Sequence, residues 1–262
     1  MSFLRYYLSL LYRTIKNKGF YNKNKGFIIK FFQENGYNQT KPFNINKWHH
    51  DLYLFTAIDN NGSQVFIKLT NLPRILKNEN RAYKKLRKNS YLKNHLIEHK
   101  GYIKKDGYKA LILKRANGVV LNEEWAYQNI DKLGDLIRIV DEFTNLSLIH
   151  RDIKLDNFIY EEGHIKVFDF SFMIDMTEDK KMKEIDLTNN ENMIKLVTMG
   201  VGYKPAPLKW DDYFALYVVF KLLLNNKPST ISLEKSNLLE LYLKESSDKI
   251  NSNIYTILKY TP

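Results

Sequence analysis

The segment from Leu148 to Asp169 limits the possible fold of this chain more than any other stretch. It reads LIHRDIKLDNFIYEEGHIKVFD, in which a polar cluster of His, Arg, Asp, Lys and Asn lies between short apolar runs. The runs NFIY and IKVFD flank Glu161-Glu162-Gly163, and two short strands separated by a tight glycine-containing turn are typical of a hairpin. A hairpin brings together the residues at the outer ends of its strands, so Asn157 and Asp169 are expected to lie close in space.

This hairpin suggests a metal site. Asn157 and Asp169 carry the amide and carboxylate oxygens that Mg²⁺ prefers, and magnesium is usually shared with substrate phosphates. Asp152 precedes Asn157 by five residues and is expected to project toward the same point from the loop. The segment therefore predicts two metal ligands and one further carboxylate.

Strand patterns dominate the front of the chain and helix patterns the rear. LYLFTAID and QVFIKL read as one hairpin around Asn60-Asn61-Gly62-Ser63, and GYIKKDGYKALILKR reads as a second that turns at Asp106-Gly107. Helical patterns cover residues 74–88, 122–146 and 210–224. This order predicts an α+β protein with a small sheet-rich front lobe and a helical rear lobe.

HRDIKLDN matches, at all four defined positions, the catalytic loop H-R-D-x-x-x-x-N of the protein-kinase superfamily. Asp169-Phe170-Ser171 resembles the metal-binding motif of the same superfamily, with Ser in place of the usual Gly. The resemblance implies a two-lobed protein-kinase-like fold, binding of ATP and Mg²⁺, and phosphoryl transfer to an alcohol. It assigns Asp152 and Lys154 to catalysis and Asn157 and Asp169 to the metal.

Further upstream, VFIK ends in Lys68, which is similar to the kinase lysine that contacts the α- and β-phosphates. The following helical stretch offers Glu79 in NENRAYKKL as the ion-pair partner of Lys68, with Glu98 as a competitor. Taken alone, Lys68 favours an interpretation as an exposed lysine that keeps an edge strand soluble, and the catalytic loop downstream favours the phosphate contact instead.

Two more stretches fall in the order that the resemblance implies. LILKRANGVVL resembles the segment that joins the kinase lobes and seats adenine, which places Lys114 to Ala116 near the base. KWDDYFALYVVFKLL resembles the buried helix of the rear lobe, with Asp211 as the carboxylate that braces the catalytic loop. We therefore expect an N-terminal segment at 1–40, a front lobe at 41–116 and a reduced rear lobe at 117–262.

The chain also departs from protein kinases. No G-x-G-x-x-G precedes Lys68, and NKWHHD occupies its place, so the side chains of Lys47, His49 or His50 are alternatives for phosphate contact, or the segment is an ordinary turn. No A-P-E follows the metal motif, although GVGYKPAP at 200–207 resembles a remnant, and few residues follow Leu224. These departures are similar to those of kinases that phosphorylate sugars, such as lipopolysaccharide core heptose kinases.

Charge gives the second indication about partners. The net charge is +12, and no acidic residue precedes Glu34. In residues 1–33 an apolar stripe at helical spacing accompanies the basic residues: Leu4, Tyr7, Leu8, Leu11 and Ile15. This pattern predicts either peripheral contact with an anionic membrane or a helix that packs on the protein body. No run approaches the roughly 18 apolar residues needed to span a bilayer.

The expected function is transfer of the γ-phosphate of ATP to a sugar hydroxyl of a lipopolysaccharide core or another anionic glycan. The expected location is the cytoplasm, with peripheral contact at the inner face of its membrane as one of the two alternatives for residues 1–33. A Ser/Thr protein kinase with a protein substrate is the alternative that Lys154 favours, and a pseudokinase that only binds is the third. The absence of cysteine excludes thiolate chemistry, and no motif suggests a nucleic-acid partner.

Overall fold

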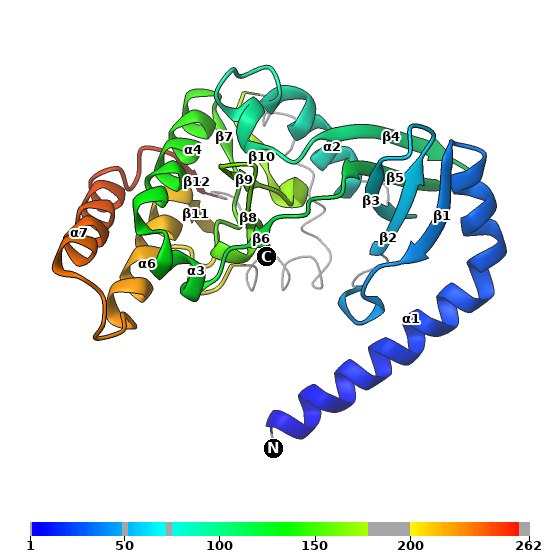
Figure 1. Cartoon of the computed structure of the whole chain (residues 1–262), viewed down its shortest axis with the longest axis horizontal. Coiled ribbons are helices and arrows are strands. Elements are labelled where there is room, and N and C mark those ends of the chain that lie inside the picture. Colours follow the sequence, from blue (N-terminus) through cyan, green and yellow to red (C-terminus); the bar gives the residue numbers. More distant parts are fainter. Residues whose placement is uncertain (1, 49–51, 72–74, 178–199, 257–262) are drawn as a thin grey trace, which may run out of the picture. The chain divides into compact units, whose positions relative to one another are not determined.

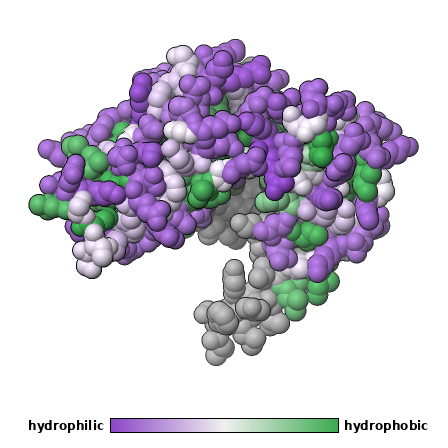
Figure 2. All heavy atoms as spheres, viewed as in Figure 1, coloured by the Kyte–Doolittle hydropathy of each residue, from purple (hydrophilic) through white to green (hydrophobic). Residues whose placement is uncertain are grey.

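The computed structural model describes residues 2–48, 52–71, 75–177 and 200–256 (Figure 1). The chain divides into two compact units: unit 1 comprises residues 1–80 and 97–116, and unit 2 comprises residues 81–96 and 117–262. Helices and antiparallel strands both contribute, so the predicted α+β class is confirmed. Hydrophilic residues cover most of the visible surface, with separate hydrophobic areas between them (Figure 2). Across the described residues, no helix is both long enough and apolar enough to cross a bilayer.

Unit 1 is built on one antiparallel sheet of five strands in the order β1-β2-β3-β5-β4. Its strands are β1 (Tyr37–Pro42), β2 (Leu52–Asp59), β3 (Gln64–Thr70), β4 (His99–Lys105) and β5 (Tyr108–Lys114). Both predicted hairpins are confirmed, since β2 pairs with β3 and β4 pairs with β5. Strand β1 was not predicted, because its sequence YNQTKP is polar and lacks the alternation of a half-buried strand.

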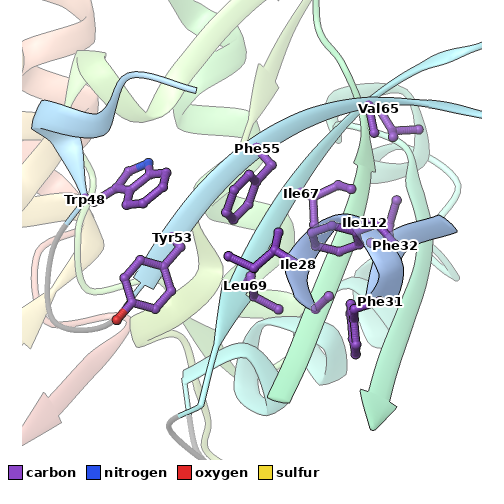
Figure 3. Packing of buried hydrophobic residues seen from close by; sticks show 12 residues of the cluster. Ile28, Phe31, Phe32, Trp48, Tyr53, Phe55, Val65, Ile67, Leu69 and Ile112 are labelled. Atoms are coloured by element: carbon purple, nitrogen blue, oxygen red, sulfur yellow. The ribbon is translucent and has the colours of Figure 1, made fainter. Parts of the chain in front are cut away.

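One face of this sheet packs against the long helix α1 (Ser2–Gln33). Figure 3 shows Ile28, Phe31 and Phe32 of the helix directed at Ile67 and Leu69 of the sheet. Trp48, which follows the short 3₁₀ helix η1 (Ile45–Lys47), closes the aromatic side of this core against Tyr53 and Phe55. The second half of α1 therefore contributes to the core of unit 1, through Ile28, Phe31 and Phe32.

The other face of the sheet carries the polar residues of β3. Successive side chains of a strand alternate between faces, so Lys68 points away from the core that Ile67 and Leu69 share with α1. After β3, and before the last two strands of the sheet, the chain forms α2 (Ile75–Leu86), as the pattern of residues 74–88 predicted. The boundary between the two units falls inside this helix, between Asn80 and Arg81.

Unit 2 is mainly helical. Its helices are α3 (Glu123–Gln128), α4 (Gly134–Asn145), α6 (Asp212–Asn225) and α7 (Leu233–Asp248), with 3₁₀ helices η2 (Leu92–His95) and η3 (Ile130–Lys132). Helices α4, α6 and α7 pack on one another through buried side chains such as Phe143, Phe220 and Leu239. The helix predicted at 122–146 is thus divided into α3, η3 and α4, while the one predicted at 210–224 matches α6.

Short strands complete unit 2. They are β6 (Val119–Val120), β7 (Leu148–Ile149), β8 (Phe158–Glu161), β9 (His164–Val167), β10 (Ile174–Asp175), β11 (Lys209–Asp211) and β12 (Ile254–Thr256). Strands β8 and β9 form the predicted hairpin, and β6 adds to its edge. Gly118 permits this addition, because a Cβ atom there would lie 2.2 Å from the carbonyl oxygen of Tyr160.

Candidate functional site

The lysine predicted to contact phosphate forms an ion pair inside unit 1. The Nζ atom of Lys68 lies 2.9 Å from Oε1 and 3.0 Å from Oε2 of Glu79, so the ammonium contacts both carboxylate oxygens. Both residues are buried, and Lys68 belongs to the central strand β3, paired with Leu54 on one side and Leu111 on the other. The predicted partner Glu79 is confirmed, whereas the competitor Glu98 pairs with Lys100.

The residues predicted to contact adenine lie at the end of strand β5, where Lys114 is the last residue of the strand and Ala116 follows it. The backbone N–H of Lys114 donates to the carbonyl of Glu98, and the N–H of Arg115 donates to the carbonyl of Gln64. Among the described residues, the backbone of Ala116 makes no hydrogen bond. Ala116, unlike Lys114, therefore has a backbone N–H and a backbone carbonyl that are free to bond to a ligand.

In unit 2 the predicted catalytic loop is held by a buried carboxylate. Asp212 accepts a hydrogen bond from the backbone N–H of His150 at 2.6 Å and one from that of Arg151 at 3.0 Å. Burial raises the pKa of Asp212 to about 7, although these two hydrogen bonds act in the opposite direction. Arg151 adopts a positive φ of 70°, and its guanidinium lies over the Trp210 ring.

The sequence assigned this bracing role to Asp211, and that assignment is wrong. Asp211 is the N-cap of α6, where its Oδ1 atom accepts from the backbone N–H groups of Tyr213 and Phe214. Its Oδ2 atom accepts from the backbone of Asn251. The two neighbouring carboxylates differ in direction because the cap residue has extended backbone angles whereas Asp212 is already helical.

His150 is fully buried, and its hydrogen bonds define its protonation state. Its Nδ1 atom accepts from the backbone N–H of Asp152, which requires that nitrogen to be unprotonated, and its Nε2 atom therefore donates to the carbonyl of Phe168. Burial lowers the pKa of the imidazole, which agrees with a neutral ring. His150 thus acts as a rigid link between the loop and the end of β9.

Three of the predicted site residues form one hydrogen-bonded cluster. The Oδ2 atom of Asp152 lies 2.9 Å from Nζ of Lys154 and 2.8 Å from Nδ2 of Asn157. The same amide nitrogen of Asn157 also donates to the backbone carbonyl of Asp152 at 2.7 Å. Asp152 is partly exposed, and Asn157, which ends the 3₁₀ helix η4 (Leu155–Asn157), is buried. The loop therefore presents a solvent-accessible carboxylate whose position two neighbours fix.

The β8–β9 hairpin places the predicted metal ligands at its open end. Phe158 pairs with Val167, and the N–H of Phe168 donates to the carbonyl of Asn157, so Asp169 follows directly after the last bonded pair. Because Nδ2 of Asn157 is held by Asp152, its Oδ1 atom is the part of the amide left for a cation. These oxygen donors fit Mg²⁺, which is held by few protein ligands together with substrate phosphates.

Asp169 has a left-handed backbone conformation, with φ 64° and ψ 66°, at the start of the 3₁₀ helix η5 (Phe170–Phe172). The hydroxyl of Ser171 donates to Oδ1 of Asp169 at 2.8 Å. Ser171 therefore orients the carboxylate of the residue two positions before it.

Phe170 holds this turn in place through a cluster of aromatic rings. Its ring centroid lies 4.9 Å from that of Tyr83 and 5.3 Å from that of His150, both edge to face. Phe143 of α4 contacts both the His150 ring and the Phe170 ring. The residue that follows the predicted metal ligand Asp169 is thus held among buried rings.

Sequence reasoning missed three residues of this arrangement: Asp212, Ser171 and Tyr83. The spacing of Ser171, two residues after Asp169, is a usable signal because short polar side chains often bond to neighbours at that distance. No group of three His, Asp or Glu side chains suitable for a metal occurs in the described part of the chain. His49 and His50 lie outside the described residues, as does the side chain of Lys47.

A scan against models of protein families gave no match to this chain, and a search of curated proteins gave none.

Proposed function

We propose that this protein is an ATP-dependent kinase that transfers the γ-phosphate to an alcohol, most readily the hydroxyl of a sugar. The observation that carries the proposal is the cluster in which Lys154 and Asn157 both bond to the carboxylate of Asp152, beside the hairpin end that carries Asp169. The motif HRDIKLDN resembles the catalytic loop of protein kinases, which supports the same proposal.

In this proposal Asp152 is the group that positions the acceptor. Its partly exposed carboxylate would accept a hydrogen bond from the acceptor hydroxyl, orient the oxygen for in-line attack on the γ-phosphorus and take the proton late in the step. The bond from the γ-phosphorus to the β,γ-bridging oxygen would break, and ADP would leave. Lys154 neutralises Asp152 in the absence of substrate and would turn to the transferring phosphoryl group during the reaction. Asn157 limits the rotation of the carboxylate.

The remaining residues would hold the nucleotide. Asn157 and Asp169 would bind Mg²⁺, which when bound neutralises charge on the β- and γ-phosphates. Lys68 would contact the α- and β-phosphates, with Glu79 fixing the direction of its ammonium. The free backbone groups of Ala116 would bond to the edge of adenine, with the aliphatic part of Lys114 beside the base. Because the reaction uses ATP, the proposal places the protein in the cytoplasm.

The kind of acceptor is inferred from the features in which this chain differs from protein kinases. The residues before Lys68 lack a glycine-rich loop, and a net charge of +12 favours an anionic acceptor such as a phosphorylated glycolipid or a lipopolysaccharide core. Kinases of such sugars resemble this chain in the same departures.

A Ser/Thr protein kinase is the second candidate, and one observation favours it. Lys154 pairs with Asp152 and follows it by two residues. In Ser/Thr protein kinases the phosphate-contacting lysine occupies this same position relative to the catalytic aspartate. A pseudokinase is disfavoured, because Lys68, Asp152, Asn157 and Asp169 are all present.

The deciding experiment offers labelled ATP with Mg²⁺ to the purified protein together with either lipopolysaccharide core oligosaccharide or a generic protein substrate. We expect label in the oligosaccharide, none with the Asp152→Asn variant, and full transfer with Asp156→Asn, which changes an exposed carboxylate of the same loop. Transfer to protein alone would replace the sugar acceptor with the second candidate. No transfer to any acceptor, together with no thermal stabilisation by ATP and Mg²⁺, would overturn the kinase proposal.

A further inference from the structure

Helix α1 is anchored to unit 1 by residues from Thr14 onward. The hydroxyl of Thr14 bonds to Oδ1 of Asn46, and the amide of the buried Asn17 donates to the carbonyls of Ile45 and Trp48. Further along, Ile28 and Phe31 enter the core of the sheet. The helix itself begins at Ser2, so more than two of its turns precede the first of these anchors.

The part of α1 around these first anchors carries exposed apolar side chains. Leu11 is 55% exposed, Tyr12 71% and Ile15 63%. Figure 2 shows hydrophobic surface at this part of the helix. The sequence continues the same spacing toward the N-terminus with Leu4, Tyr7 and Leu8. An exposed contiguous apolar stripe of this kind marks an interaction surface more often than an isolated exposed leucine does.

This stripe lies on a different side of α1 from the residues that enter the core. Successive residues of an α-helix are about 100° apart, which puts the side of Leu11 and Ile15 about 150° from the side shared by Asn17, Ile28 and Phe31. A helix that only packed on the sheet would keep its apolar residues on one side throughout. The change of side shows that Leu11 and Ile15 do not extend the core of unit 1.

The charge of α1 indicates what covers the stripe. The helix contains no Asp or Glu, and its cations are Arg5, Arg13, Lys16, Lys18, Lys23, Lys25 and Lys30. Lys16, Lys18 and Lys23 are exposed. Apolar residues flanked by lysine, with tyrosine among them, match the interface of an anionic bilayer, where leucine enters the acyl boundary and lysine remains at the headgroups.

We propose that α1 binds the protein peripherally to an anionic lipid surface, through the stripe of Leu11, Tyr12 and Ile15 and the lysines beside it. The helix lies in the plane of the headgroups and inserts only its apolar side. The surface does not depend on the kinase proposal, since none of its residues belongs to the candidate site.

Co-sedimentation of the full chain with phosphatidylcholine vesicles, with and without phosphatidylglycerol, tests this proposal. We expect binding only to the vesicles that contain phosphatidylglycerol, and weaker binding at high salt. The variant L11Q/I15Q should bind about tenfold or more weakly, because two side chains no longer leave water. The variant K16Q/K18Q should also bind these vesicles more weakly, by about fivefold for each cation removed.

The matched control is L233Q/L241Q, which changes two exposed leucines of α7 and should bind like the unmodified protein. Equal binding to both vesicle types, or undiminished binding of L11Q/I15Q, would overturn the proposal. Sedimentation velocity without lipid tests the alternative that a second copy of this chain covers the stripe. A dimer that L11Q/I15Q converts to a monomer would support that alternative and would overturn the proposal of lipid binding.

Discussion

The charged pairs at the predicted site residues of the two units differ in burial. In unit 1, Lys68 and Glu79 are both buried and are provided by a strand and a helix. In unit 2, Asp152 and Lys154 lie on an irregular loop, and side-chain exposures of 15% and 37% leave both open to solvent. A buried pair is sensitive to the loss of either partner, whereas an exposed pair can exchange its partner for a substrate. Lys68 and Glu79 are therefore fixed to each other, whereas the carboxylate of Asp152 remains accessible to a molecule from solvent.

The largest expected effect tests the exposed cluster. Asp152→Asn and Asp169→Asn should each lower phosphoryl transfer by about a thousandfold or more, because one removes the group proposed to orient the acceptor and the other a proposed metal ligand. The free energy of unfolding should change by less than about 1 kcal/mol for Asp152→Asn, since that carboxylate is partly exposed. Urea titration alongside the activity assay measures both quantities, with Asp156→Asn as the control.

The buried pair should respond in the reverse manner. Lys68→Met or Glu79→Leu alone should cost about 3–5 kcal/mol of stability, because each leaves an uncompensated buried charge. The double variant should recover most of that stability and still lack activity. The exposed pair of Lys105 and Glu34 is the control, and Lys105→Met should leave the free energy of unfolding nearly unchanged. Full activity of the double variant would contradict a role of Lys68 in binding phosphate.

Asp212 provides a pH-dependent test of the loop support. Its pKa is raised from 3.8 to about 7 in the folded protein, so the folded state binds the extra proton between these values. This contribution to stability is complete below about pH 4 and is lost as the pH rises through about 7. The stability of the unmodified protein relative to Asp212→Asn should thus fall by about 2 to 4 kcal/mol over that range. Urea unfolding at several pH values, with the exposed Asp248→Asn as reference, measures the difference. An unchanged difference would mean that Asp212 does not titrate in this range.

The smallest effect concerns the hydroxyl that orients Asp169. Ser171→Ala should raise the Mg²⁺ concentration for half-maximal activity about fivefold, because one hydrogen bond to the carboxylate is lost. Ser63→Ala, in the exposed turn between β2 and β3, should leave that concentration unchanged. If Ser171→Ala and Ser171→Gly both behave like the unmodified protein, the hydroxyl has no positioning role.

Residues that form a contiguous motif could be placed from the sequence alone. The hairpin and its flanking Asn157 and Asp169 depend on local turn chemistry and on strands only four residues long, so the pattern determines the geometry. The partner of Lys68 was also predictable, because a helix following the strand offers few acidic residues within reach.

Residues that depend on tertiary burial could not be placed in this way. Asp211 and Asp212 are adjacent, and only the position of the α6 N-terminus decides which one supports His150. Tyr83 contacts Phe170 across 87 positions of the chain, a contact that no local pattern encodes. Helix α1 carries two apolar sides in succession, and the sequence indicates the first side but does not say that the second belongs to the core.

The alternation of strand β3 has a consequence for folding. A shift of β3 by one residue relative to β2 would turn Lys68 toward Phe31 and Phe55, and would turn Ile67 and Leu69 toward the position of Glu79. Such a misaligned sheet would bury an ammonium group among aromatic rings with no acceptor. The residue proposed to hold phosphate therefore also selects the correct register of the sheet before any nucleotide binds.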